Sequence, residues 1–317
     1  MEQDTRSGGH GAGVAPGASS LGATDLQAAE ALAAGGLVIL PTETVYGLAA
    51  DASNGEAVAR IYAAKGRPRF NPLIVHVRNL DHALEIAKFE KAALDLATRF
   101  WPGPLTLVLP LGEGAPVAPI VTAGLATVAV RCPAHPAMRE LLEATRRPLA
   151  APSANASGRI SPTRAEHVLA SLGGRIPLIV DGGPTTHGLE STIVAVAGGV
   201  LRVLRPGPID LGAAETGASA IEAPGQMASH YAPAKPVRLD ATEAAPGEWL
   251  IGFGAVDGDS SLSRSADLVE AAANLFDRLH EAEAQDRPRI AVAPVPDEGL
   301  GQAINDRLRR AAVPPPG

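Results

Sequence analysis

The sequence predicts an α/β protein, with a twisted mixed sheet in a larger first domain and a second, smaller α/β domain after it. Helix and strand patterns alternate from residue 26 to about residue 205, and the strand patterns outnumber the helices that could connect them. A stretch rich in Gly, Pro, Ala and Ser, from Pro206 to Pro236, precedes a further set of such patterns. Because parallel strands need crossover connections, the excess of strands favours a mixed sheet over a purely parallel one.

Residues 1–20 consist mainly of Gly, Ala, Ser and Pro with scattered charges. Such a segment cannot bury enough apolar surface to offset the entropy lost on ordering, so we expect a disordered tail. We expect the larger domain over residues 21–210, a linker over 211–236 and the smaller domain over 237–317.

In the larger domain, apolar periodicity predicts helices that end at Ala34 and Lys65, two more before Trp101, and two others near residues 136–146 and 164–172. Runs of apolar and β-branched residues predict strands over residues 37–40, 73–77, 105–109, 127–131, 149–151, 178–180, 191–196 and 200–204. The last two are separated by Gly198-Gly199, which predicts a hairpin. In the smaller domain we expect strands over residues 249–253 and 290–293, and helices over 266–284 and 301–312.

The composition limits the classes of function. A net charge of -7 argues against a surface built mainly for nucleic acid, so any polyanion site must be local. The single cysteine, Cys132, excludes an intrachain disulfide framework and a Cys-rich zinc or iron-sulfur site. No segment has the length or apolarity of a membrane span or a secretory signal. We therefore expect a cytoplasmic protein that does not associate with membranes.

The most informative segment is residues 65–72, which places Lys65, Arg67 and Arg69 beside Asn71 and two prolines. It follows a predicted helix, with Gly66 at the C-cap position, and precedes a predicted strand. Guanidinium groups bind phosphate or carboxylate oxygens with two hydrogen bonds, and an ammonium group adds a compact charge. We therefore expect an anion site whose cations are exposed to a cleft. The alternative is a solvated basic loop.

Four polar turns lie next to predicted strands, at residues 41–48, 151–158, 188–192 and 204–208. Together with the Lys65 segment they predict a cleft lined by hydroxyl groups and arginines, suited to a nucleotide and a small carboxylated substrate. The usual nucleotide and hydrolase signatures are missing: the sequence has no Walker loop, no HExxH pair and no GxSxG elbow.

The motifs in these turns resemble a known family. PTETVYGL, KGRPRFNPL, PSANASG, GLEST and LRPG, in this order, are similar to the YrdC-type domain of the threonylcarbamoyl-AMP synthases over residues 22 to 210. The sequence His230-Tyr231-Ala232-Pro233 and the later EAAANLF and PVPDEGLGQAINDRLRRAA resemble the linker and C-terminal domain of the longer members. The resemblance implies a YrdC-like fold, related in shape to some double-stranded-RNA binders, with a basic concavity.

The resemblance implies a nucleotidyltransferase. It would join L-threonine, bicarbonate and ATP into L-threonylcarbamoyladenylate and release pyrophosphate. The product would pass to a tRNA threonylcarbamoyl transferase, for modification of the adenosine beside the anticodon. ATP would be a substrate, with Mg²⁺ carried by the ATP and by water. The sequence leaves open whether tRNA itself binds stably.

The resemblance also implies residue roles. Lys65 and Arg67 would act in catalysis. The L-threonine site would comprise Thr44, His76, Arg131, Ala151 and Ser191. The ATP site would comprise Lys65, Arg67, Asn71, Thr127, Ser153, Asn155, Ser161, Arg205 and Tyr231.

Two features qualify these roles. The linker reads Gln226-Met227-Ala228-Ser229 where the family has Met-Lys-Tyr, which puts its contact with nucleotide in question. His76 has the alternative interpretation of a strand histidine whose neighbours satisfy its hydrogen bonds. We still expect residues 224–235, with His230 and Tyr231, to lie across the nucleotide cleft and act as a lid.

Two other functions remain as alternatives. One is an RNA-binding module that uses the basic concavity directly, which the acidic net charge argues against. The other is a carbamoyl transferase, because maturation factors that use carbamoyl phosphate contain the same domain. Those factors carry additional zinc-binding and acylphosphatase-like parts, which this sequence lacks.

Overall fold

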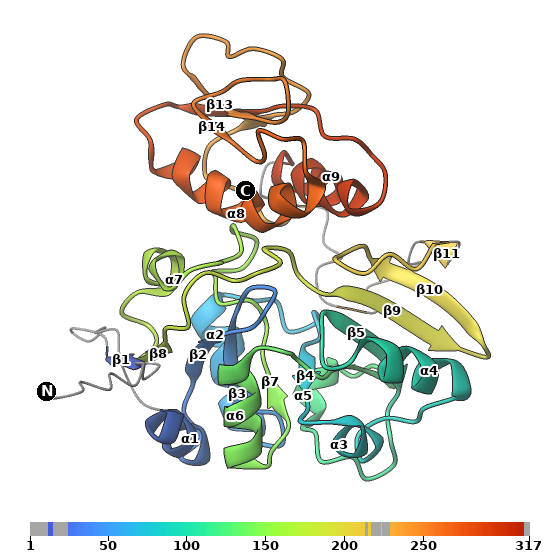
Figure 1. The fold of residues 1–317 in the computed structure, drawn as a ribbon. Helices are drawn as coiled ribbons and strands as arrows, with labels where there is room; N and C mark the ends of the chain where they lie inside the picture. Colours follow the sequence, from blue (N-terminus) through green and yellow to red (C-terminus); the bar gives the residue numbers. More distant parts are fainter. Residues whose placement is uncertain (1–11, 15–24, 213–214, 217–222, 224–228, 314–317) are drawn as a thin grey trace, which may run out of the picture.

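The computed structural model describes residues 12–14, 25–212, 215–216, 223 and 229–313. A larger domain is built on an 11-stranded sheet and a smaller domain on a four-stranded sheet. Figure 1 shows the smaller domain above the larger one. The order in the large sheet is β1-β8-β2-β3-β7-β4-β6-β5-β9-β10-β11. It contains parallel pairs such as β4 with β6 and antiparallel pairs such as β2 with β3, so the predicted mixed sheet is confirmed.

The helices of the larger domain are α1 (Asp25–Ala33), α2 (Gly55–Lys65), α3 (Leu80–Leu84), α4 (Lys91–Phe100), α5 (Pro119–Thr122), α6 (Pro136–Thr145) and α7 (Ala165–Leu172). Its strands are β1 (Ala12–Val14), β2 (Val38–Pro41), β3 (Tyr46–Asp51), β4 (Ile74–His76), β5 (Leu105–Pro110), β6 (Thr127–Arg131), β7 (Leu149–Ala150), β8 (Leu178–Val180), β9 (Thr192–Ala197), β10 (Val200–Arg205) and β11 (Glu215–Thr216). Each strand predicted in this domain is present, with ends that shift by one residue at most. The predicted hairpin is also present, and both Gly198 and Gly199 have positive φ.

One predicted turn is wrong. We expected residues 41–48 to form a turn, but Tyr46–Asp51 is strand β3 and pairs antiparallel with β2, so only Thr42 to Val45 turn. The segment YGLAAD has no β-branched residue, yet all six of its residues are buried. Tertiary burial therefore overrides a weak local preference for strand.

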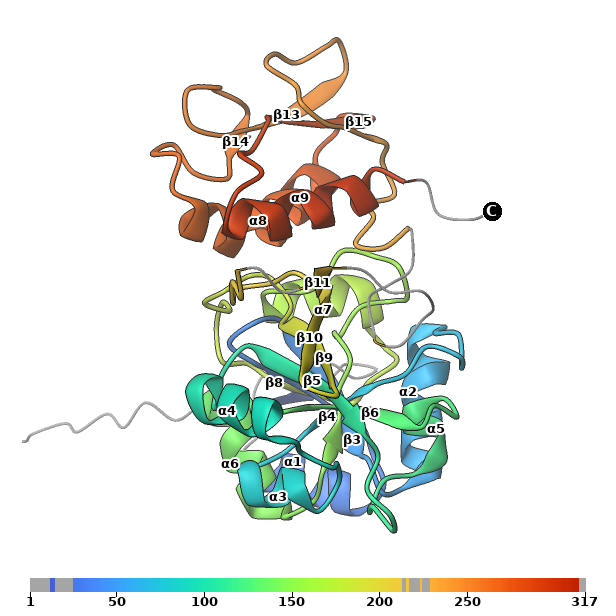
Figure 2. The ribbon, with the colours of Figure 1, turned by 90° about the vertical axis from the view of Figure 1, so that its right-hand side faces the viewer.

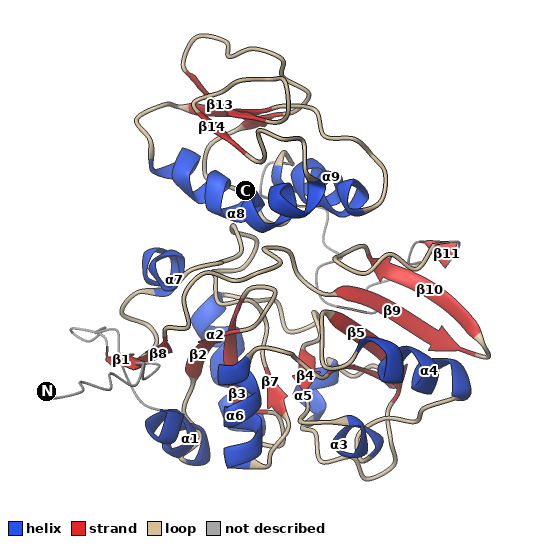
Figure 3. Cartoon of the chain, in the orientation of Figure 1, coloured by secondary structure: helices blue, strands red, loops and turns tan. Residues whose placement is uncertain are grey.

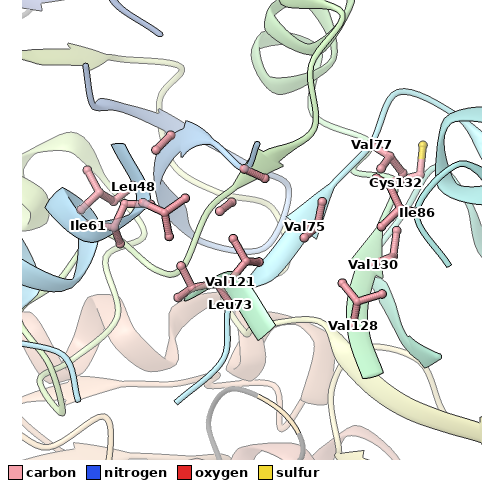
Figure 4. Close-up of a cluster of buried hydrophobic side chains, with 14 of the residues drawn as sticks. Leu48, Ile61, Leu73, Val75, Val77, Ile86, Val121, Val128, Val130 and Cys132 are labelled. Atoms are coloured by element: carbon pink, nitrogen blue, oxygen red, sulfur yellow. The ribbon is translucent and has the colours of Figure 1, made fainter. Parts of the chain in front are cut away.

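Apolar helices cover both faces of the sheet. Because side chains alternate along a strand, Ile39 of β2 joins the core with α2 and α5, whereas Val38 and Leu40 join α1 and α6 on the other face. Figure 4 shows the first of these cores, in which Leu48, Ile61, Leu73, Val75 and Val121 lie among the labelled side chains. This packing fixes the strand ends from which the polar turns emerge.

Most of the expected tail and half of the expected linker lie outside the described residues. Within the tail, Ala12–Val14 forms β1 and pairs antiparallel with β8. Within the linker, Glu215–Thr216 forms β11, parallel to β10. The unusual segment Gln226 to Ala228 is not described.

The smaller domain has a parallel sheet in the order β12-β15-β13-β14, formed by β12 (Val237–Arg238), β13 (Glu248–Gly252), β14 (Ser260–Ser261) and β15 (Arg289–Val292). Its helices α8 (Leu268–Ala284) and α9 (Leu300–Ala311) lie on one face of that sheet, as the colouring of Figure 3 makes clear. The four elements predicted here are confirmed, whereas the two-residue strands β12 and β14 are too short for a sequence pattern.

Helices α8 and α9 lie between the small sheet and the larger domain (Figures 1 and 2). The apolar core of the smaller domain includes Val45, Ile160 and Leu189 from the larger domain. The backbones also approach closely: a Cβ at Gly188 would lie 2.4 Å from the carbonyl oxygen of Ala273. The two domains therefore share a packed interface.

Candidate active site

A cleft in the larger domain opens where several polar segments meet, and its space amounts to about 550 Å³ when the open solvent at its mouth is counted. The contributing segments are the β2–β3 turn with the start of β3, the segment after α2, strands β4 and β6, the loops after β7 and before β9, the end of β10, and the segment before the smaller domain that carries His230. The lining residues are Thr42, Thr44, Val45, Gly47, Arg67, Ile74, His76, Arg131, Ala151, Pro152, Ser153, Glu190, Ser191, Arg205 and His230.

A buried ion pair fixes Arg131 at one end of the cleft. Its Nη2 donates to Glu43 Oε1 at 2.6 Å, and its Nη1 donates to Thr44 Oγ1 at 2.9 Å. Glu43 Oε2 accepts hydrogen bonds from the backbone N–H groups of Ala134 and His135. Burial alone would raise the pKa of Glu43, but the charge and hydrogen bond of Arg131 and the backbone donors lower it to about 2. Glu43 is therefore ionised and holds the guanidinium in one orientation.

Arg205 is fixed against Ser191 on another wall. Its Nε donates to the Ser191 carbonyl and its Nη2 to Ser191 Oγ, both at 3.0 Å. Ser191 Oγ also lies 2.7 Å from Thr106 Oγ1. Burial lowers the pKa of Arg205. These contacts place a cation and a hydroxyl group side by side, with both residues lining the cleft.

The Lys65 segment differs from the expectation. Gly66 caps α2 with a φ of 61° as predicted, but Lys65 is the last helical residue and is only 3% exposed. Its Nζ donates to the carbonyl oxygens of Ser153, at 2.5 Å, and Asn155. Burial and the charge of Arg67 hold the pKa of Lys65 well below its usual value. The expectation that these cations are exposed is wrong for Lys65.

Arg67 also turns inward. Its Nη2 donates to the Pro72 carbonyl at 2.9 Å and its Nε to the Asn71 carbonyl at 3.3 Å. Burial lowers its pKa to about 10, so it stays charged at neutral pH. Only Arg69 of the three cations is exposed. The solvated-loop alternative is therefore wrong for Lys65 and Arg67.

His76 lies at the end of β4 and is buried. Its Nδ1 has no hydrogen-bond partner within the described part of the chain, although the residue lines the cleft. Burial, followed by the charge of Arg131, lowers its pKa to about 3, so the imidazole is neutral at physiological pH. The interpretation of His76 as a histidine satisfied by its neighbours is therefore wrong for Nδ1.

Comparisons with known proteins match both domains of this chain. A family model described as "Telomere recombination" (Sua5_yciO_yrdC) matches residues 30–207, and one described as "Threonylcarbamoyl-AMP synthase, C-terminal domain" matches residues 191–313. A threonylcarbamoyl-AMP synthase of Bacillus subtilis (strain 168) is 40% identical, covering 90% of this chain and 92% of the relative. One of Pyrococcus abyssi (strain GE5 / Orsay) is also 40% identical, with 88% and 91% covered.

This chain belongs to the threonylcarbamoyl-AMP synthase family. The crystal structure of P. abyssi Sua5 complexed with L-threonine superposes with a TM-score of 0.83 and 38% identity, covering 91% of this chain and 94% of that one. The family assignment makes the chain an enzyme, an ATP-using L-threonylcarbamoyladenylate synthase of tRNA modification.

The cleft brings together eight of the residues that the family resemblance implied: Thr44, Arg67, His76, Arg131, Ala151, Ser153, Ser191 and Arg205. Most of the others lie just behind its wall. Lys65 bonds to the lining residue Ser153, and the Ser161 hydroxyl donates to Glu190 at 2.5 Å. Thr127 lies farther away, at the start of β6 and opposite Pro110.

Three other implied residues contact the cleft through a neighbour. The Asn71 carbonyl accepts from Arg67, and the Asn155 carbonyl accepts from Lys65. Tyr231 is fully buried, and its ring lies 4.1 Å from that of His230, which lines the cleft. The Tyr231 hydroxyl has no hydrogen-bond partner among the described residues.

Sequence reasoning missed two carboxylates that organise the cleft, Glu43 and Glu190. Both lie within the quoted motifs, in PTETVYGL and GLEST, but no spacing rule identifies their partners. Glu190 bonds to Ser161 and to Arg307 Nε, which comes from α9 of the smaller domain. A signal for Arg307 does exist, because it lies on the apolar face of α9 together with Ile304, Leu308 and Ala311.

Arginines hold both of the carboxylates that organise the cleft. Glu43 is bound to Arg131, and Glu190 is bound to Arg307 and Ser161. No group of three or more His, Cys, Asp or Glu residues in the described ranges is arranged to hold a metal ion. The same ranges contain no helix long and apolar enough to cross a membrane.

Proposed function

We propose that this cleft joins L-threonine, bicarbonate and ATP into L-threonylcarbamoyladenylate, with Arg131 and its neighbours holding the amino acid and Arg67, Arg205 and Lys65 holding the nucleotide. The observation that carries the assignment of roles is the buried Glu43–Arg131 pair, which fixes one cation in a cleft that also contains two other arginines. The similar P. abyssi Sua5 structure is a complex with L-threonine, which supports an amino-acid site in this fold.

At the amino-acid end, Arg131 suits the carboxylate of L-threonine, because a guanidinium binds a carboxylate through paired hydrogen bonds. Thr44 and Ser191 add hydroxyl groups nearby, and Ala151 closes the site with its backbone. His76 adds a neutral imidazole whose Nδ1 is unpaired among the described residues. A neutral His76 can bond to a polar substrate group without adding a further charge beside Arg131.

At the nucleotide end, the chemistry requires stabilisation of negative charge. The amine of L-threonine forms a C–N bond with bicarbonate while a bicarbonate C–O bond breaks and water leaves, which gives a carbamate. A carbamate oxygen then attacks the α-phosphorus of ATP while the bond to pyrophosphate breaks. Arg67 and Arg205 are buried cations placed to stabilise the charge that develops. A polyphosphate bound nearby would favour the charged form of Lys65. Lys65 would then act as a cation together with Arg67 and Arg205. No covalent enzyme intermediate is needed, because the carbamate is itself the nucleophile.

His230 and Tyr231 supply the proposed lid of the nucleotide end. His230 lines the cleft, and both His230 Nδ1 and the Tyr231 hydroxyl lack hydrogen-bond partners among the described residues. Unpaired buried polar atoms cost free energy, so a ligand that pairs with them is favoured. In this proposal His230 and Tyr231 contact ATP and exclude water from the adenylate.

The remaining parts of the proposal concern partners. Mg²⁺ would be carried by ATP and water, because this small, hard cation keeps several waters and binds phosphate oxygens. The adenylate would pass to a tRNA threonylcarbamoyl transferase in the cytoplasm, and pyrophosphate would leave.

The test is pyrophosphate release by the full chain with each substrate omitted in turn. We expect release to require ATP, L-threonine and bicarbonate together, because the carbamate nucleophile exists only when L-threonine and bicarbonate are both present. Equal release in buffer without L-threonine and depleted of bicarbonate would overturn the proposal. A tRNA gel shift that depends on salt, without pyrophosphate release, would instead favour an RNA-binding module.

A further inference from the structure

Arg307 reaches from the smaller domain to the wall of the cleft. It lies on α9, and its side chain is fully buried. Its Nε donates to Glu190 Oε2 at 3.0 Å, and its Nη1 donates to the Pro206 carbonyl at 2.8 Å. Burial opposes the charged form of Arg307, but Tyr231, Glu190 and Asp306 raise its pKa above the usual value.

Glu190 is the only acidic residue in the described lining of the cleft. Its other carboxylate oxygen accepts the Ser161 hydroxyl, and Arg205 stands beside it on the neighbouring Ser191. A carboxylate at this place has the same sign as the polyphosphate that the cleft is proposed to bind. Without a partner it would repel that ligand, in surroundings where solvent screens charge weakly.

We propose that Arg307 is a positioning residue for the nucleotide: it neutralises Glu190 and holds it against Ser161, so that the smaller domain completes the charge balance of the ATP site. The proposal rests on the proposed function, since it takes the polyphosphate of ATP as the ligand. Arg307 itself lies behind the cleft wall and acts through Glu190. Docking of the smaller domain is thereby coupled to nucleotide affinity through one ion pair.

A merely structural role for Arg307 makes a different prediction. The two domains are also joined by an ion pair away from the cleft, in which Arg164 Nε donates to Asp277 Oδ1 at 2.6 Å. If Arg307 only tethered the domains, loss of either arginine would act in the same way. If Arg307 compensates Glu190, removal of the carboxylate charge should cancel the effect of removing the arginine.

The experiment compares the full wild-type chain with Arg307→Met, Glu190→Gln, the double variant Arg307→Met/Glu190→Gln, and Arg164→Met as the matched control. ATP affinity is measured by calorimetry without L-threonine, and the KM values for ATP and L-threonine are measured from pyrophosphate release. We expect Arg307→Met to weaken ATP binding about tenfold or more, because the uncompensated charge of Glu190 would repel the polyphosphate. We expect the KM for L-threonine to stay near that of the wild type.

The double variant decides between the two roles. We expect it to recover ATP affinity to within about threefold of the wild type, because the charges of Glu190 and Arg307 are removed together and Asp306, the other carboxylate that pairs with Arg307, keeps its ion pair with Arg310. Arg164→Met should leave ATP affinity unchanged. A double variant that binds ATP as weakly as Arg307→Met, or an Arg307→Met chain that binds ATP normally, overturns the proposal.

If Arg307→Met does not fold, the double variant carries the test alone, and its failure to fold or to bind ATP also overturns the proposal. Calorimetry measures ATP binding without turnover, so the result for Arg307 can be distinguished from the result for the proposed reaction. A wild-type chain that binds ATP but releases no pyrophosphate would refute the function and leave the Arg307 result to be judged separately.

Discussion

Replacement of Glu43 by glutamine tests how the amino-acid end of the cleft is organised. The change keeps the shape of the side chain but removes the charge that pairs with Arg131 at 2.6 Å. The pKa of Glu43 falls from an ordinary 4.5 to about 2. Each pKa unit corresponds to about 1.4 kcal/mol, so the ionised carboxylate contributes roughly 3 kcal/mol to folding at neutral pH. Removal of one partner of a buried pair costs about the same.

The direction of the pH dependence follows from the lowered pKa. Ionised Glu43 contributes fully above about pH 4.5, and that contribution is lost as the pH falls towards 2. We therefore expect Glu43→Gln to lower the free energy of unfolding by about 3 kcal/mol at pH 7 and to weaken the acid dependence of stability below pH 4.5. Urea unfolding over a pH series measures both quantities.

The same substitution should impair catalysis. Arg131 would lose the carboxylate that orients it, and a misplaced binding group can lower kcat/KM for L-threonine by about 100-fold. Glu113→Gln is the control, since Glu113 is exposed on a loop. The reasoning is refuted if Glu43→Gln matches Glu113→Gln in unfolding free energy and in kcat/KM.

Three other predictions concern the nucleotide end. Lys65→Ala should lower kcat by about 100-fold, which a turnover assay measures. It should also destabilise the fold by about 1–3 kcal/mol in urea unfolding, because two buried carbonyl oxygens lose their donor. Arg67→Ala should lower kcat by a similar factor of about 100, and near-native turnover would place it outside the catalytic machinery. Tyr231→Ala should weaken ATP binding in calorimetry, because the Tyr231 ring packs against His230 at the cleft; an ATP affinity equal to that of the wild type would remove the lid.

Local patterns predicted most of this fold because they depend on nearby residues. The hairpin at Gly198-Gly199 and the C-cap at Gly66 need only their own backbone conformations, and both are present. Strand β3 could not be predicted in the same way, because its small residues become a strand only when packed against β2 and β7.

The sequence likewise predicted some residues of the cleft but not the long-range contacts that hold them. The family resemblance implied Arg131, Ser191 and Arg205 as site residues, but it did not predict the inward turn of Lys65. The partners of Lys65 lie about ninety residues away in sequence, at Ser153 and Asn155. The pairing of Glu190 with Arg307 joins two domains and spans 117 positions. No periodicity or spacing specifies such a contact, which depends on how the domains dock.

The apolar core that Val45, Ile160 and Leu189 share with the smaller domain has a thermodynamic consequence. Neither domain can unfold without exposing side chains that the other buries, so we expect their unfolding to be cooperative. Calorimetry of the full chain should then give a single heat-absorption peak whose van't Hoff and calorimetric enthalpies agree. Two resolved peaks would mean that the domains melt independently. Because Val45 lies in the turn that also carries Glu43 and Thr44, the amino-acid site should lose its shape in the same transition as the smaller domain.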